Sequence, residues 1–268
     1  MRRWTVVRTG GLAIVAVVAI GAVYQLPASP FSRRPFPDHE TVNSGSTVAT
    51  AVPAEVPPTP AISPTPVATP PITYPFAGTR SYAVLSGNPA VIGREGRLMT
   101  YQIAIEGGIT GIDRAALAQF VRETYGAPQG WAAQGLWRFQ QVGPRQNPDF
   151  KLMLVTPATR DAICGSAPDR YTSCRIGDQV VLNVARWVRG VPNYGASLAT
   201  YRQYMINHET GHRLGRGHEL CPGPGQPAPV MQQQTLGLHR CTPYAWPYFS
   251  GDRYMGRLGQ YDDDVPHS

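Results

Sequence analysis

The chain has only one lysine, Lys151, among its 24 basic residues, so the other 23 are arginines, which are scattered along the sequence. It also lacks any sequence module typical of nucleic-acid-binding proteins, and we therefore expect no nucleic-acid partner. The net charge of +7 predicts an ordinary solvated basic surface or, as the alternative, attraction to anionic polymers of the cell envelope or to acidic substrates.

Three arginines precede an apolar stretch of 18 residues at the N-terminus, from Thr9 to Leu26. A basic flank followed by a hydrophobic segment is typical of an export signal. The small-residue cleavage site near Ala28 is followed closely by Pro30, which favours a single-pass signal-anchor over residues 1–26 rather than a cleaved signal peptide. Both interpretations place the rest of the chain outside the cytoplasm.

Residues 27–73 lack periodicity and are rich in Pro, Thr, Ser and Ala. This composition predicts an extended, disordered linker. The composition changes at Tyr74, and we expect one folded domain over residues 74–268.

Cysteine is scarce, and all four residues lie in the C-terminal half of the chain: Cys164, Cys174, Cys221 and Cys241. An even number in an exported chain indicates two disulfides, for which three pairings are possible. We favour Cys164–Cys174 with Cys221–Cys241, because short loops close at the lowest entropic cost. Four buried free thiols are the alternative.

The pattern of the domain predicts an α+β (mixed α/β) fold, with two helices packed against a central sheet. Asp113 is suited to cap a helix over Arg114–Tyr125, and Ser197 is suited to cap a second over Leu198–Leu214. A further short helix is predicted near Tyr254. Apolar runs predict strands over Ser81–Ser86, Leu98–Ile105, Leu136–Val142, Phe150–Thr156 and Gln179–Ala185.

The end of the second predicted helix carries the pattern H-E-x-x-H-x-x-G-x-x-H, from His208 to His218. His208 and His212 are four residues apart and project from one helical face, so their imidazoles can meet one metal ion. Gly215 permits a positive φ after the helix, and the turn brings His218 back towards the same ion. Three imidazoles leave the fourth position of tetrahedral zinc open for water, which is typical of a catalytic site.

Glu209 follows the first histidine and can reach that water from the side. Because zinc lowers the pKa of a bound water towards ~7, we predict that Glu209 is the general base that takes the water's proton and delivers it to the leaving amine. Three of the six histidines fall within these eleven residues, which chance composition does not readily produce. The alternatives are a histidine-rich helix end without metal and a zinc site without catalysis.

The segment resembles the metzincin zinc metallopeptidases, whose extended motif it matches at every fixed position. More narrowly, residues 207–246 resemble uncharacterised exported actinobacterial proteins with a zincin-like domain. The resemblance implies a twisted sheet, a backing helix and an active-site helix, followed by a methionine turn beneath the ion. Met231, 13 residues after His218, is the candidate for this turn, with an ordinary core methionine as the alternative. A Cys221–Cys241 disulfide would clamp its loop.

The sequence departs from some metzincins at Gln233, where they carry a tyrosine two residues after the methionine. Tyr244, Tyr248 and Tyr254 are possible substitutes, but we expect packed aromatic residues. Glu219, directly after the third histidine, matches the astacin branch of the metzincins. Because the tyrosine is missing, we do not assign the chain to that branch.

No cysteine precedes Cys164, so latency through a propeptide thiol has no candidate. His239 is expected to be a surface histidine, with substrate contact as the alternative. The acidic tail Asp262–Asp264 is expected to be solvated, with cation binding as the alternative.

Taken as a hypothesis, these features predict an extracellular zinc-dependent hydrolase of peptide or protein substrates, held to the membrane by its N-terminal segment. One alternative acts on the peptides of the cell wall, which the long linker and basic charge favour. Another is a non-catalytic binding module stabilised by zinc.

Overall fold

The computed structural model describes residues 70–165 and 169–266. The predicted N-terminal anchor and nearly all of the predicted linker lie outside these residues. Within them, no helix has both the length and the apolar character needed to cross a membrane. Thr73 pairs with Thr110, and Ile72 packs against the main core, so the described contacts begin just before Tyr74.

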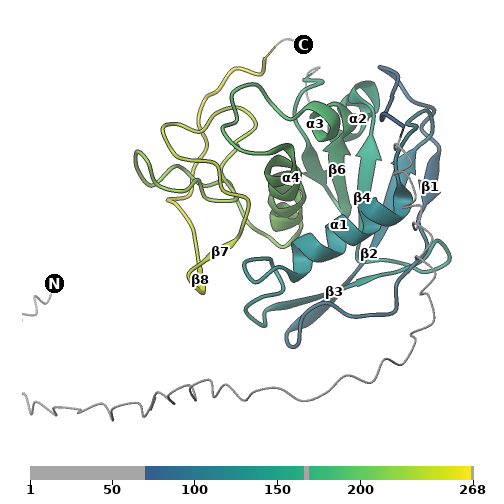
Figure 1. Cartoon of the computed structure of the whole chain (residues 1–268), viewed down its shortest axis with the longest axis horizontal. Helices are drawn as coiled ribbons and strands as arrows, with labels where there is room; N and C mark the ends of the chain where they lie inside the picture. Colours follow the sequence, from purple (N-terminus) through teal and green to yellow (C-terminus); the bar gives the residue numbers. More distant parts are fainter. Residues whose placement is uncertain (1–69, 166–168, 267–268) are drawn as a thin grey trace, which may run out of the picture. The chain divides into compact units, whose positions relative to one another are not determined.

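A six-stranded mixed sheet forms the centre of the domain (Figure 1). Its strand order is β1-β2-β4-β6-β5, with β3 also paired to β2. The pairs β2–β3, β2–β4 and β4–β6 are parallel, whereas β1 and β5 pair antiparallel to their neighbours. The strands are β1 (Tyr82–Val84), β2 (Arg97–Glu106), β3 (Trp137–Gln141), β4 (Phe150–Val155), β5 (Cys174–Ile176) and β6 (Gln179–Asn183).

The long strand β2 pairs with three neighbours. Tyr101 pairs with Gln141 of β3 and with Phe150 of β4, which places these strands on opposite edges of β2. Further along, residue 104 pairs with β1 on one edge and with β4 on the other. Strands β3 and β1 therefore follow one another along a single edge of β2.

The two faces of the sheet have different coverings. Tyr101, Ile103 and Ile105 of β2 belong to the main core, which also contains buried residues of three helices. Ala104 points the other way and packs with Met153 in a smaller cluster that includes Cys164 and Cys174 at its margin. This division follows from the two-residue period of a strand.

Both of the longer helices begin where the sequence predicted. The Asp113 side chain accepts a hydrogen bond from the backbone N–H of Ala116, and Ser197 accepts one from Thr200. Each cap satisfies a donor that has no partner within its helix. The helices are α1 (Arg114–Gly126), α2 (Pro157–Cys164), α3 (Val184–Arg189) and α4 (Leu198–Arg213).

The predicted α+β fold is confirmed, but three details differ. The strand expected over Gln179–Ala185 ends at Asn183, because the Asn183 side chain caps α3 by accepting from the Ala185 N–H. The sequence pattern does not predict α2, α3 or β5. The helix predicted near Tyr254 is wrong: a hairpin of β7 (Tyr248–Phe249) and β8 (Asp252–Arg253) precedes that residue. Ser250 and Gly251 at its turn have positive φ, which a right-handed helix excludes.

Candidate metal centre

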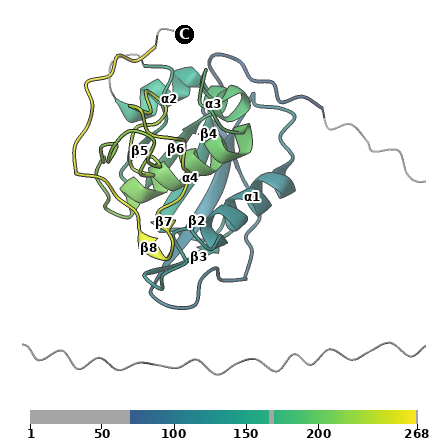
Figure 2. The same ribbon diagram turned by 60° about the vertical axis from the view of Figure 1, so that its left-hand side comes forward.

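Helix α4 lies between the sheet and the irregular C-terminal region in both views of the domain (Figures 1 and 2). The part of α4 that precedes the motif carries Tyr201, Tyr204, Met205 and Ile206, which are all buried in the main core. This apolar face fixes the helix before the motif begins. The histidines of its last turns therefore project from a rigid element.

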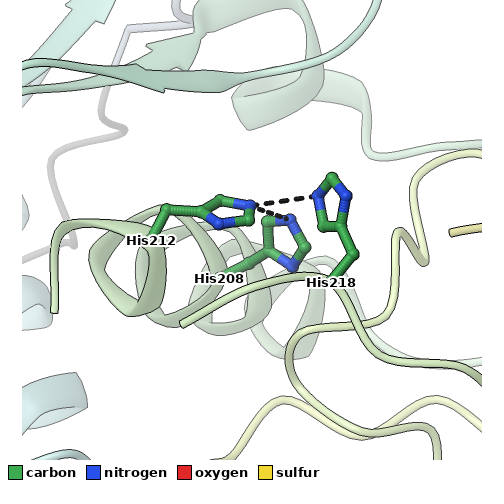
Figure 3. A group of neighbouring side chains, drawn as sticks. All are labelled: His208, His212 and His218. Atoms are coloured by element: carbon green, nitrogen blue, oxygen red, sulfur yellow. Dashed lines mark hydrogen bonds between the residues drawn. The ribbon is translucent and has the colours of Figure 1, made fainter. Parts of the chain in front are cut away.

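The three histidines of the motif converge (Figure 3). Nε2 of His212 lies 3.2 Å from Nε2 of His208 and 3.0 Å from Nε2 of His218. Gly215 has the expected positive φ, +83°, and an added Cβ there would meet no atom within 4 Å. The glycine is therefore needed for its backbone conformation rather than for space, and the turn it makes returns His218 to the helix.

The Nδ1 atom of each histidine faces an oxygen that can only accept. His208 Nδ1 lies 2.8 Å from the Val230 carbonyl, and His212 Nδ1 lies 2.8 Å from the Arg216 carbonyl. His218 Nδ1 lies 2.9 Å from Oε1 of Gln260. Each Nδ1 must therefore carry the proton, so each Nε2 presents a lone pair to the shared point. Three lone pairs at this spacing are suited to one metal ion, and these atoms form the candidate metal group.

Burial keeps the cluster neutral. Desolvation lowers the pKa of His208 well below its ordinary value and that of His212 to about 4. Burial also lowers the pKa of His218, although the bond to Gln260 opposes the shift. Since a metal binds the unprotonated ring nitrogen, the site is ready for an ion at neutral pH without first losing protons.

Glu209 shares a cleft of about 660 Å³ with the three histidines. Burial raises the pKa of its carboxyl group to about 8, and the positive charges of Arg160 and Arg175 oppose this shift. Arg160 is itself buried and bonded to Thr172, while the Arg175 guanidinium donates to the His212 carbonyl. A cation held by the histidines would further favour the ionised carboxylate.

Met231 is fully buried and lies against the helix that carries the motif. Gly211 stands between the two helical histidines, and a Cβ there would overlap the Met231 sulfur. The Met231 carbonyl accepts from the backbone N–H of Glu219, one residue after the third histidine. The loop that was predicted as a methionine turn therefore touches both the helix and the chain beyond it.

The two favoured disulfide pairings are confirmed. Cys164 is bonded to Cys174, and Cys221 is bonded to Cys241, which leaves no free cysteine. The second bond encloses the Met231 loop, and the first joins the end of α2 to β5. Because disulfides persist in oxidising compartments, they support a location outside the cytoplasm.

A family model described as a protein of unknown function (DUF3152) matches residues 69–247. The chain belongs to this family. No curated protein and no solved structure matches the chain. The DUF3152 match includes all three histidines and Glu209, whereas the segment from Tyr248 onward follows it.

Gln233 and the three tyrosines considered as its substitutes differ in whether they line the cleft. Gln233 lines the cleft together with the histidines. Tyr244 and Tyr254 instead pack edge to face, and Tyr248 packs edge to face with Trp131. These three tyrosines are packed aromatic residues, as expected. In the part of the chain that the structure describes, none of the three lines the cleft.

The predicted surface histidine His239 and one residue of the predicted solvated acidic tail, Asp263, contact each other in this DUF3152 protein, whereas Asp262 and Asp264 are exposed. Asp263 Oδ2 lies 2.8 Å from Nε2 of His239, and their side chains are 20% and 27% exposed. Asp263 also lines the cleft. Tail residues beyond the family match therefore reach the candidate centre, and Gln260 is another of them. Gln260 was not predicted from the sequence, because 42 residues separate it from His218.

Proposed function

We propose that the protein is an extracytoplasmic zinc-dependent peptidase. The observation that carries this proposal is the meeting of three imidazole lone pairs with a buried carboxyl group in one open cleft. Zn–N bonds of about 2.0–2.1 Å in a tetrahedral site place two ligand nitrogens roughly 3.3 Å apart. The separations of 3.0 and 3.2 Å are close to that value, and three neutral imidazoles are a common set for zinc.

A bound zinc would supply Lewis acidity, polarising a substrate carbonyl and lowering the pKa of a water in the fourth position. The chain's own residues then move the proton. Glu209 would take it from the attacking water and pass it to the leaving amine. The water oxygen then joins the acyl carbon as the C–N bond breaks, and the products are a carboxylic acid and an amine, which become a carboxylate and an ammonium group once the acid's own proton is transferred. Gln233, which lines the same cleft, offers an amide that can hydrogen-bond to substrate.

The edge of the sheet supports an extended peptide as substrate. Strand β5 pairs with β6 alone among the described strands, and residues 173–175 line the cleft. An unpaired strand edge beside a reactive centre can bind a peptide backbone by strand addition. The metzincin resemblance of the motif supports the same substrate class.

The proposal is tested with purified full-length protein, which should contain about one zinc per chain and cleave peptides from a library. Glu209→Gln should retain the zinc but lose at least a hundredfold in turnover, the lower end of the ~10²–10⁴-fold contribution of a general base. Glu123→Gln, on the exposed side of α1, is the matched control. Unchanged turnover in Glu209→Gln would refute the mechanism.

The choice of substrate separates two forms of this proposal. The net charge of +7 favours binding to anionic cell-wall polymers, so purified wall and casein should be digested in parallel. Release of wall peptides favours a cell-wall peptide hydrolase, whereas cleavage of casein alone favours a general protein substrate.

We also propose that the N-terminal segment is retained as a single-pass membrane anchor. Its 18-residue apolar stretch after three arginines supports this topology. The mass of the mature protein is the test, and loss of about the first 28 residues would show a cleaved signal instead.

A further inference from the structure

The C-terminal segment from Arg257 to Val265 runs alongside the chain that carries the third histidine. The backbone N–H of Leu220 donates to the Arg257 carbonyl at 2.8 Å, and that of Gly259 donates to the His218 carbonyl at 3.0 Å. Figure 1 shows this region, in yellow, on the side of α4 that faces away from the sheet. The segment is therefore placed against the metal cleft, of which Gln260, Asp263 and Val265 form part of the wall.

Side-chain contacts hold the chain in place both before and after Gln260. Before it, Arg253 forms an ion pair of 2.8 Å with Glu219, whose side chain is only 4% exposed. After it, Asp263 bonds to His239, and the ring of Tyr261 stacks on the same imidazole at a centroid distance of 3.4 Å. Gln260 is thus carried by a backbone that is fixed at both ends, which lowers the entropic cost of holding its side chain in place.

His218 is the histidine that most needs an external partner. His208 and His212 stand on a helix, and their Nδ1 atoms donate to backbone carbonyls. His218 lies on the chain after the helix, and its Nδ1 donates to the side chain of Gln260. A loop ring has more freedom to rotate or to change tautomer than a helical one, and either change removes its Nε2 lone pair from the shared point.

We propose that Gln260 is the positioning residue for His218, and that the C-terminal segment belongs to the metal centre because it holds Gln260 in place. This inference rests on the proposed zinc site. It assigns a role to a segment that follows the family match, which ends at residue 247.

The first test measures zinc affinity of the full-length protein by competition with a chromophoric chelator. Gln260→Ala should weaken binding about tenfold, at the low end of the ~10–100-fold effect of such partners, because Gln260 is exposed and water can replace part of its bond. Gln260→Glu should restore affinity, since a carboxylate accepts the same bond. Gln134→Ala, at an exposed position outside the metal cleft, is the matched control and should leave affinity unchanged.

The second test reads the imidazole directly. In metal-free protein, ¹⁵N NMR should show His218 protonated at Nδ1, and Gln260→Ala should convert it to a mixture of tautomers while the thermal midpoint changes little. Asp263→Ala, which removes the bond to His239, should shift the zinc affinity and the His218 tautomer in the same direction but by less. A structural role alone would lower the thermal midpoint without changing the tautomer.

The outcomes separate the two proposals. Normal zinc uptake by the wild type with unchanged affinity and tautomer in Gln260→Ala would overturn the role of Gln260 and leave the zinc site standing. A Gln260→Glu variant as weak as Gln260→Ala would also overturn it. A wild-type protein that takes up no zinc would overturn both.

Discussion

At the scale of single residues, Gly211 shows how tightly the candidate centre is packed from below. A Cβ at this position would overlap the Met231 sulfur and lie 2.9 Å from Cζ2 of Trp131. Both neighbours are fully buried, so neither can move without disturbing the core.

We therefore predict that Gly211→Ala lowers the free energy of unfolding by about 1–3 kcal/mol, the usual cost of overpacking, and also weakens zinc binding. Denaturant unfolding and chelator competition measure the two effects. Gly223→Ala is the control, because an added Cβ there meets its nearest atom only at 4.0 Å. Equal stability of the two variants would show that Met231 does not rest on the helix.

Glu209 gives a pH prediction for the metal-free protein. Burial raises the pKa of its carboxyl group from 4.5 to about 8, so between these values the native state holds a proton that the unfolded state has lost. The free energy of unfolding should therefore fall as pH rises from about 4.5 to about 8, by a few kcal/mol from this group. The histidines have lowered pKa values and contribute the opposite slope.

The Glu209 contribution is isolated by comparing wild type with Glu209→Gln in denaturant at a series of pH values. The variant should gain stability relative to wild type as pH rises through this window, while Glu123→Gln should show no such gain. A constant difference between wild type and Glu209→Gln across the window would contradict the buried carboxyl group.

The motif residues were predictable because their relation is local. A spacing of four on a helix fixes the directions of His208 and His212, and a glycine after the helix predicts the turn that returns His218. Gln260 and Arg160 were not predictable, because long-range packing brings them to the site. No local spacing relates a glutamine to a histidine 42 residues away.

At the scale of elements, the Cys221–Cys241 bond closes the loop that contains Met231, with a sequence separation of 20. Replacing both cysteines by serine should lower the free energy of unfolding by about 3 kcal/mol, since the unfolded chain regains the freedom of that loop. Because the loop also supports the helix through Met231, zinc affinity should fall as well.

The matched control is the double serine variant of Cys164 and Cys174, whose separation is 10. This bond joins α2 to β5, so its loss should lower stability with a smaller effect on zinc affinity. Denaturant titration measures the stability of both variants, and chelator competition measures their zinc affinity. A larger loss of zinc affinity in the Cys164–Cys174 variant would contradict the proposed support by the Met231 loop.

The elements that the sequence predicted are those with a strong internal pattern. Helices α1 and α4 have cap residues with side-chain bonds to the first turn, and β2, β4 and β6 are apolar runs. Elements α2, α3 and β5 were missed because, unlike β4 and β6, they are not continuous apolar runs, and three to eight residues carry too little periodicity to reveal them otherwise. The hairpin before Tyr254 contains two residues with positive φ, and its two-residue strands depend on tertiary contacts rather than on propensity.

At the scale of the whole molecule, the main core is built from apolar side chains and holds helix α4 in place. It extends from the sheet through α1 to the buried face of α4, and it includes Met231. The ends of Tyr125 and Trp131 also bond to α4, through the Thr210 hydroxyl and the Asn207 carbonyl. Helix α4 is therefore held by packing and hydrogen bonds that do not involve the three histidines.

We predict that a chelator abolishes peptide cleavage but leaves the fold intact. Circular dichroism should keep its helical signal, and activity should return with zinc. Zinc at 100 times its Kd should add about 2.7 kcal/mol to the free energy of unfolding, and His208→Ala should lose that gain while it remains folded without metal. Unfolding on chelation would instead favour the non-catalytic, zinc-stabilised binding module, because such domains require the ion for folding itself. Chelation separates the peptidase from the binding module because both use the same three ligands, but only the binding module needs the ion to fold.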